Sequence, residues 1–210
     1  MILRILLIIT LFMPLSSAVA GSYDELLTAI KSNDLPAADA LFARGMDANT
    51  SDSSGNTLLM IAVRENHAHM ARRLLQLQAK VGARNQYGES ALMLAAANGE
   101  LELVKLFVAH GAEVNMAGWN PLIYAAWRGR TEVVKYLLEK GADIDAVSPN
   151  GVSALMMAAR DGHFDTVRLL LWEVADPNIK SESGASALGW ARKAGNSEIA
   201  DLLKHAGARD

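Results

Sequence analysis

The sequence predicts an all-α repeat solenoid, in which stacked helix-turn-helix units are joined by short β-hairpin-like fingers. One leucine recurs at intervals of 33, 33, 30, 33 and 33 residues, at Leu26, Leu59, Leu92, Leu122, Leu155 and Leu188. An alanine follows each leucine after three residues, at Ala29, Ala62, Ala95, Ala125, Ala158 and Ala191. A fixed period of about 33 residues is typical of repeat proteins, in which each unit buries its apolar face against its neighbours.

Each unit contains the same predicted elements in the same order. Apolar residues at helical spacing predict a short inner helix, a tight turn and a longer outer helix. The turns are expected at Asn98-Gly99, Arg128-Gly129, Asp161-Gly162 and Ala194-Gly195. Hydroxyl residues precede the inner helices and should cap their free N–H groups, at Thr57, Ser90, Ser153 and Ser186. Glycine supplies the left-handed residue that ends outer helices, at Gly111, Gly141 and Gly207.

The chain divides into a signal peptide over residues 1–20 and a repeat domain over residues 21–210. Arg4 precedes an apolar run that Pro14 breaks, and Ala18-Val19-Ala20 offers small residues for cleavage after Ala20. An uncleaved anchor is less favoured, because the run is shorter than the roughly 20 residues that span a bilayer. The predicted units are 22–54 as an N-terminal cap, 55–87, 88–117, 118–150, 151–183 and 184–210 as a C-terminal cap.

Three stretches show the repeat most clearly. They read GNTLLMIAVRENHAHMARRLLQLQAKVG from Gly55, GESALMLAAANGELELVKLFVAHGAEVN from Gly88 and GVSALMMAARDGHFDTVRLLLWEVADPN from Gly151. This pattern resembles the ankyrin repeat family, over roughly residue 23 to the end. The resemblance implies a rigid, non-catalytic module that binds another protein through its finger tips and the exposed side of its inner helices.

Two features depart from that family pattern. Gln78 and Val174 replace the glycine that ends an outer helix. A left-handed valine costs on the order of 1–2 kcal/mol, so the turn at Val174 is expected to change shape. The 30-residue interval makes the finger over residues 113–118 three residues shorter than its neighbours. A notch in the row of fingers is expected there.

Composition argues against several classes of function. The net charge is −3, and loss of Arg4 with residues 1–20 leaves 19 Lys+Arg against 23 Asp+Glu, or −4. A mildly acidic protein lacks the basic face that nucleic-acid binding requires. There are no cysteines for disulfides, thiolate metal sites or nucleophiles. His67 and His69 lie two residues apart, on different faces of a helix, and no serine sits in a nucleophile elbow. We therefore predict no enzyme, no metal and no cofactor.

The candidate binding surface is a row of variable positions after the paired small residues of each inner helix. Its members include Arg64, Trp127, Arg160 and Lys193, and the adjacent row holds Arg128 and Asp161. Tyr87 and Glu89 from one finger, and Trp119 beside the short finger, are expected to converge on Trp127. Tryptophan, tyrosine and arginine together are typical of protein interfaces. Tyr124 and Trp190 fall at core positions and are interpreted as core fillers, and Trp172 is placed on the outer, convex side.

The N-terminal pattern predicts an exported protein, periplasmic or secreted, and the basic side chains of the candidate binding surface imply an acidic surface feature on its partner. The resemblance to exported bacterial ankyrin proteins implies that it inhibits, protects or scaffolds that partner. It is expected to be a monomer with no membrane span once the signal peptide is removed. A secreted effector that acts in another cell is one alternative. A small-ligand-binding protein or enzyme, with a pocket formed by Trp119, Trp127, Arg128 and Arg160, is a less favoured one.

Overall fold

The computed structural model describes the backbone of residues 15–209 and the side chains from residue 21. Residues 1–14 of the predicted signal peptide lie outside this range. The described residues form twelve α-helices, in two units that divide between Met46 and Asp47. No helix of the described part has the length and apolarity that a bilayer crossing requires.

The first unit contains helices α1 (Leu15–Lys31) and α2 (Leu35–Ala43), which pack against each other. Asp34 caps α2, because its Oδ1 atom accepts a hydrogen bond from the Ala37 N–H at 3.0 Å. Pro36 occupies the first turn of α2, where its missing N–H has no helical partner to lose. Helix α1 continues past Ala20, so cleavage at that residue stays a prediction.

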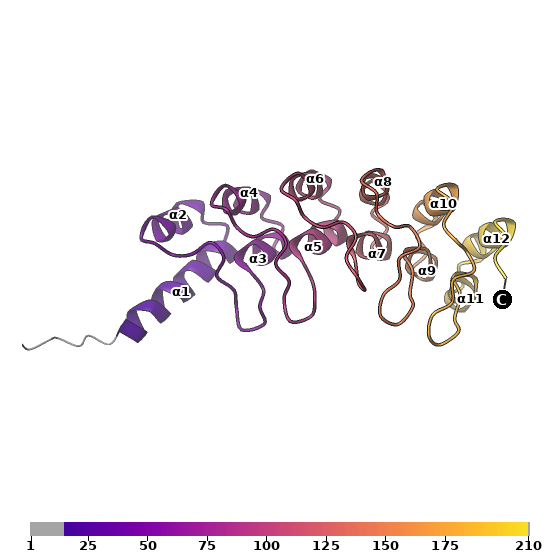
Figure 1. The fold of residues 1–210 in the computed structure, drawn as a ribbon, viewed down its shortest axis with the longest axis horizontal. Coiled ribbons are helices and arrows are strands. Elements are labelled where there is room, and N and C mark those ends of the chain that lie inside the picture. Colours follow the sequence, from indigo (N-terminus) through magenta and orange to yellow (C-terminus); the bar gives the residue numbers. More distant parts are fainter. Residues whose placement is uncertain (1–14, 210) are drawn as a thin grey trace, which may run out of the picture. The chain divides into compact units, whose positions relative to one another are not determined.

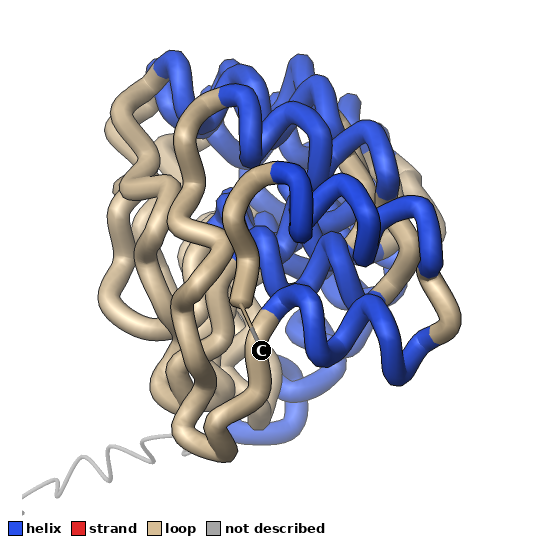
Figure 2. Tube along the Cα trace, turned by 90° about the vertical axis from the view of Figure 1, so that its right-hand side faces the viewer, coloured by secondary structure: helices blue, strands red, loops and turns tan. Residues whose placement is uncertain are grey.

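The second unit stacks five helical pairs in the order of the chain (Figure 1). Its inner helices are α3 (Leu58–Arg64), α5 (Ala91–Asn98), α7 (Pro121–Trp127), α9 (Ala154–Arg160) and α11 (Ala187–Ala194). Its outer helices are α4 (Ala68–Gln76), α6 (Leu101–Ala109), α8 (Thr131–Glu139), α10 (Phe164–Trp172) and α12 (Ser197–His205). Each inner helix contacts the next one, and Figure 2 shows the loops gathered on one side of the helical layers. The predicted all-α solenoid is confirmed.

The periodic leucines and alanines form the core of these layers. From Leu59 to Leu188 the leucines are at most 2% exposed, and the matching alanines from Ala62 to Ala191 are fully buried. Met60, Met93 and Met156 lie beside them and are also buried. Small alanines allow neighbouring helices to approach closely, and the leucines fill the space that remains. The sequence period is therefore the period of the core.

Predicted caps and turns are present in the second unit. The hydroxyl oxygens of Thr57, Ser90, Ser153 and Ser186 each accept a hydrogen bond from the backbone N–H three residues later. Asn120 does the same for α7, with its Oδ1 atom 2.9 Å from the Ile123 nitrogen. These bonds fix where each inner helix begins, and hence which side chains face the surface.

The turn at Val174 contradicts the expectation from the sequence, because it keeps the left-handed shape. Val174 has φ 67° and Gln78 has φ 61° at the equivalent position. The Ala175 N–H donates to the Leu170 carbonyl at 2.9 Å, and the Val174 N–H donates to the Leu171 carbonyl at 3.2 Å. These bonds close the helix end and bury Ala175, so the surrounding structure imposes the strained backbone on valine.

We expect Val174→Gly to raise the free energy of unfolding by about 1 kcal/mol, because glycine adopts positive φ without the steric cost of a β-branched side chain. The Val174 side chain is 81% exposed, so its removal leaves no cavity. Urea denaturation measures the change. Gln78→Gly is the matched control and should give a smaller gain, since glutamine is not β-branched. A destabilised Val174→Gly protein would show that the valine is not strained.

The fingers between units are closed by short bridges, and some of them are hydrogen-bonded to the preceding finger. Isolated antiparallel bridges close three of them, between Ser51 and Thr57, Arg84 and Ser90, and Val147 and Ser153. The Gln86 N–H donates to the Ser54 carbonyl at 3.1 Å, and the Glu182 N–H donates to the Asn150 carbonyl at 3.0 Å. Each of these bonds joins a finger to the one before it. The loop before α7 carries the three-residue deletion and is visibly the shortest in Figure 1.

Candidate functional site

Five side chains of the second unit line a cavity of about 270 Å³, which we call the aromatic cavity. They are Trp119, Tyr124, Trp127, Met157 and Arg160. Trp119 precedes the capping residue of α7, whereas Tyr124 and Trp127 lie three residues apart on α7 and so share one face of it. Met157 and Arg160 have the same spacing on α9. Two neighbouring inner helices and the end of the short finger therefore form the cavity together.

The three aromatic rings of the cavity pack edge to face. The ring centroids of Trp119 and Tyr124 are 6.2 Å apart with planes at 88°, and those of Tyr124 and Trp127 are 6.1 Å apart at 89°. This geometry sets the positive edge of one ring against the negative face of the next, which favours it over parallel stacking. Tyr124 is thus the central ring, and it fixes the orientation of both tryptophans.

A polar network holds Tyr124 in place. Its hydroxyl donates to Glu89 Oε1 at 3.2 Å, while Glu89 Oε2 accepts from Asn85 at 2.8 Å and from Arg64 at 3.4 Å. Asn56 accepts from both Arg64 and Asn85 through its Oδ1 atom, at 3.0 and 2.8 Å. Burial, followed by the negative charge of Glu89 and the hydrogen bond to it, raises the pKa of Tyr124 to about 12. The phenol is therefore neutral and committed to Glu89 at physiological pH.

A second set of polar contacts fixes Trp127. Arg160 Nε donates to Asp161 Oδ1 at 2.6 Å, and this bond is the main reason why the pKa of Asp161 lies below its ordinary value. His163 Nε2 lies 3.0 Å from the Trp127 carbonyl oxygen. The guanidinium of Arg128 stacks over the Trp127 ring at 4.3 Å, and Tyr124 packs against the same ring edge to face. The Trp127 ring is therefore in contact with both residues before any ligand binds.

The structure brings together most of the predicted site residues but not all of them. Glu89 accepts a hydrogen bond from the cavity residue Tyr124, and Arg64 forms an ion pair with Glu89. Tyr87 does not converge on Trp127 as expected: its side chain is 75% exposed and does not line the cavity. Its backbone N–H bonds Asn85 Oδ1, which closes the finger turn and leaves the ring outside. Lys193 is an exposed residue of α11 that also lies outside the cavity lining.

Tyr124, Met157 and Trp190 are the residues that the sequence interpretation missed. Tyr124 is only half-buried and is central to the cavity rather than a core filler. Trp190 is also half-buried, with the guanidinium of Arg160 5.5 Å from its ring. One signal was available, since Tyr124 lies three residues before Trp127 and must share its helix face. No such signal pointed to Met157, because methionines at neighbouring positions of the inner helices are buried core residues.

We expect Tyr124→Phe to lower the free energy of unfolding by about 0.5–1.5 kcal/mol, because it removes the hydrogen bond to Glu89 but keeps the ring. The raised pKa means that the neutral phenol is favoured in the folded state. Its contribution to stability is fully present below pH 10.0 and is lost as the pH rises through about 12. An absorbance titration of the protein minus that of Tyr124→Phe should show a phenol that ionises near pH 12, and ionisation near 10.0 would contradict the network.

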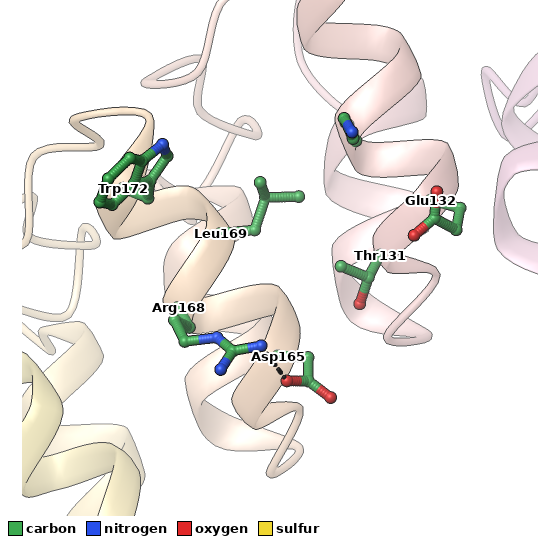
Figure 3. A pocket seen from close by; sticks show the side chains of 7 residues that line it. Thr131, Glu132, Asp165, Arg168, Leu169 and Trp172 are labelled. Atoms are coloured by element: carbon green, nitrogen blue, oxygen red, sulfur yellow. Dashed lines mark hydrogen bonds and ion pairs between the residues drawn. The ribbon is translucent and has the colours of Figure 1, made fainter.

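A larger pocket of about 460 Å³ lies between α8 and α10, on the outer layer (Figure 3). Trp172 stands at its edge with 82% of its surface exposed, as expected for the convex side. The other lining residues are Thr131, Glu132, Lys135, Asp165, Arg168 and Leu169. Arg168 donates to Asp165 at 2.8 Å, but both side chains are about two-thirds exposed, at 66% and 70%.

The aromatic cavity is the better candidate site, although the convex pocket is larger. Binding must order mobile side chains, which costs about 0.5–1.5 kcal/mol for each flexible one. In the aromatic cavity Tyr124 is already held by its bond to Glu89, and Arg160 by its bond to Asp161. Exposed ion pairs such as that of Asp165 contribute little to either stability or affinity. Within residues 15–209, no three His, Asp or Glu side chains gather as a metal site would need.

Comparisons with known proteins agree with this architecture. A family model described as ankyrin repeats (3 copies) matches residues 26–116 and 75–148. A second model, described as ankyrin repeats (many copies), matches residues 128–171. An ankyrin repeat domain from Acinetobacter baumannii, solved as a crystal structure, superposes with a TM-score of 0.74 and 32% sequence identity. That match covers 88% of this chain and 98% of the solved one.

The curated relatives match less than half of this chain. Zygote-specific protein 3 of Chlamydomonas reinhardtii is 38% identical over 101 residues, 48% of this chain and 27% of that protein. Glycerophosphocholine phosphodiesterase gde1 of Schizosaccharomyces pombe is 40% identical over 85 residues, 39% of this chain and 8% of that protein. This chain thus spans about a quarter or less of these relatives. The family models and the solved structure cover most of it, and the chain belongs to the ankyrin repeat family.

Proposed function

We propose that this chain is an exported, non-catalytic module that binds a partner protein through the aromatic cavity and the charged side chains around it. Ankyrin repeats generally mediate protein–protein interaction, and the fold is typically non-catalytic. The observation that carries the proposal is the edge-to-face group of Trp119, Tyr124 and Trp127, fixed by polar contacts at the surface. Preformed aromatic and arginine clusters supply most of the affinity in many protein interfaces.

The cavity supports protein binding over small-ligand binding or catalysis. Its volume of about 270 Å³ is below the usual range of small-molecule sites, which begins near 300 Å³. A general acid or base works best with a pKa near the operating pH, whereas the pKa of Tyr124 is raised to about 12. A single protein side chain is the occupant that this volume and this chemistry suit.

A pull-down with matched variants tests binding at the cavity. The protein purified after expression of the full sequence, its Trp127→Ala variant and its Trp172→Ala variant are each incubated with an extracytoplasmic extract. We expect a partner that the unchanged protein and Trp172→Ala retain and that Trp127→Ala loses. Loss with Trp172→Ala alone would move the site to the convex pocket, and a partner bound equally by all three would exclude both surfaces.

Export is proposed from the N-terminal pattern of Arg4, an apolar run and Ala18-Val19-Ala20. Cell fractionation followed by N-terminal sequencing should find a periplasmic or secreted chain that begins at Gly21. Recovery of that chain inside a second cell type would favour the effector alternative. A cytoplasmic chain that retains Met1 would overturn export while leaving the binding proposal intact. Inhibition, protection and scaffolding of the partner are then separated by assaying its activity and lifetime with and without this protein.

A further inference from the structure

We infer that the partner inserts a protruding loop, which places one bulky apolar side chain in the aromatic cavity and one carboxylate on Arg128. This inference rests on the proposed protein-binding function and specifies the chemistry of the partner. Three features of the second unit support it: the apolar lining of the cavity, the absence of an ion pair at Arg128 beside the cavity, and the interrupted row of fingers.

The cavity presents mostly apolar surface because two of its polar groups already have partners. The Tyr124 hydroxyl is bonded to Glu89, and the Arg160 guanidinium is bonded to Asp161. What remains is ring surface together with the thioether of Met157, which is soft and adapts to different apolar shapes. A leucine, methionine or aromatic side chain fits such a lining, whereas a polar side chain would lose its water without gaining a hydrogen bond.

Arg128 supplies the charge preference. Arg64 is paired with Glu89 and Arg160 with Asp161, at 3.4 and 2.6 Å. Among residues 15–209, Arg128 makes no ion pair, and its guanidinium carbon lies 4.3 Å from the centre of the Trp127 ring. A planar guanidinium held in this way binds a carboxylate through two parallel hydrogen bonds. Aromatic groups can also attract cations, but Arg128 and Arg160 beside these rings repel them.

The fingers indicate a loop rather than a flat surface. Bonds between neighbouring fingers link Gln86 to Ser54 and Glu182 to Asn150. The equivalent bond to the short finger cannot form from Pro149, which has no N–H and occupies the position of Gln86 and Glu182 in its own unit. The short finger itself lacks three residues, and Trp119 follows it directly. The row of fingers is therefore lowest beside the cavity, which gives a narrow protrusion access to it.

A selection experiment tests the inference without a known partner. A phage-displayed library of short, disulfide-closed random loops is selected on the protein purified after expression of the full sequence. We expect enriched loops to combine Leu, Met, Phe or Trp with a neighbouring Asp or Glu. One enriched loop is then synthesised, and its affinity is measured for variants that melt within a few degrees of the unchanged protein.

The expected pattern is specific to each side chain. Trp127→Ala and Arg128→Glu should each weaken the loop at least about tenfold, Arg128→Gln less, and Trp172→Ala by less than about twofold. A loop in which lysine replaces the acid should prefer Arg128→Glu over the unchanged protein. That exchange of preference would not arise if Arg128→Glu merely disturbed the fold.

Two outcomes overturn the inference in different ways. Loops that depend on Trp127 but carry no acid, or that ignore Arg128→Glu, would overturn the proposed chemistry and leave protein binding at the cavity in place. If no loop is enriched, or if the enriched loops bind Trp127→Ala as well as the unchanged protein, both the inference and the proposed binding site are wrong.

Discussion

Deletion of residues 184–210 is expected to make the protein aggregate and lose several kilocalories per mole of stability. This segment contains α11 and α12, whose buried residues include Leu188, Ile199 and Leu203. Helix α11 packs on α9 and helix α12 packs on α10. Burial of each large aliphatic side chain contributes about 1.5–3 kcal/mol to stability. Asn196 also donates to the carbonyls of Ala159 and Arg160, at 2.9 and 3.0 Å, and the deletion removes both bonds.

The matched control is deletion of residues 206–210, which leaves both helices of the last unit in place. The described residues beyond His205 are exposed or only partly buried, so this shorter protein should remain soluble with a small loss of melting temperature. Light scattering and thermal denaturation compare the two deletions. A soluble, monomeric protein after loss of residues 184–210 would show that α9 and α10 do not need this cap.

The repeated core could be predicted because every unit meets the same packing requirement. An inner-helix leucine must fill the space between neighbouring helices, and an alanine three residues later must let the next helix approach. Both demands recur in each unit of the second part, so the chain shows them as a period, from Leu59 and Ala62 to Leu188 and Ala191. The left-handed Val174 could not be predicted in this way, because local preference disfavours it and only the bonds around Ala175 impose it.

The candidate site was harder to predict because its residues depart from the period. Trp127, Arg128 and Arg160 were identified as variable surface positions and Trp119 as a residue beside the short finger, and the structure places all four in or beside the cavity. Tyr124 was assigned to the core because it aligns with Ile61, Leu94 and Met157. In the structure Ile61 and Met157 are buried, at 4% each, whereas Leu94 and Tyr124 are half-buried. Alignment within the chain therefore does not fix the burial of this position, and the hydroxyl of Tyr124 reaches Glu89.

Trp127→Ala is expected to weaken binding of the partner by at least about 2 kcal/mol, or roughly thirtyfold in affinity. The substitution removes one wall of the aromatic cavity and the surface on which Arg128 stacks. The side chain is half-buried, so the loss in unfolding free energy should be smaller than the loss in binding free energy. Isothermal titration with the recovered partner, beside urea denaturation of the free proteins, measures the two quantities.

Trp127→Phe separates the aromatic surface of Trp127 from the size and N–H group of its indole, which alanine removes together. Phenylalanine keeps an aromatic surface for Arg128 and for the cavity but is smaller and has no N–H group. If apolar contact dominates, Trp127→Phe should retain most of the affinity. Arg128→Glu should lower the affinity, and the loss should be larger at low salt than at high salt. If Trp127→Phe binds as poorly as Trp127→Ala, the size and N–H group of the indole matter more than aromatic surface as such. A fall in unfolding free energy that matches the fall in binding for both variants would mean that Trp127 belongs to the core and that the partner binds elsewhere.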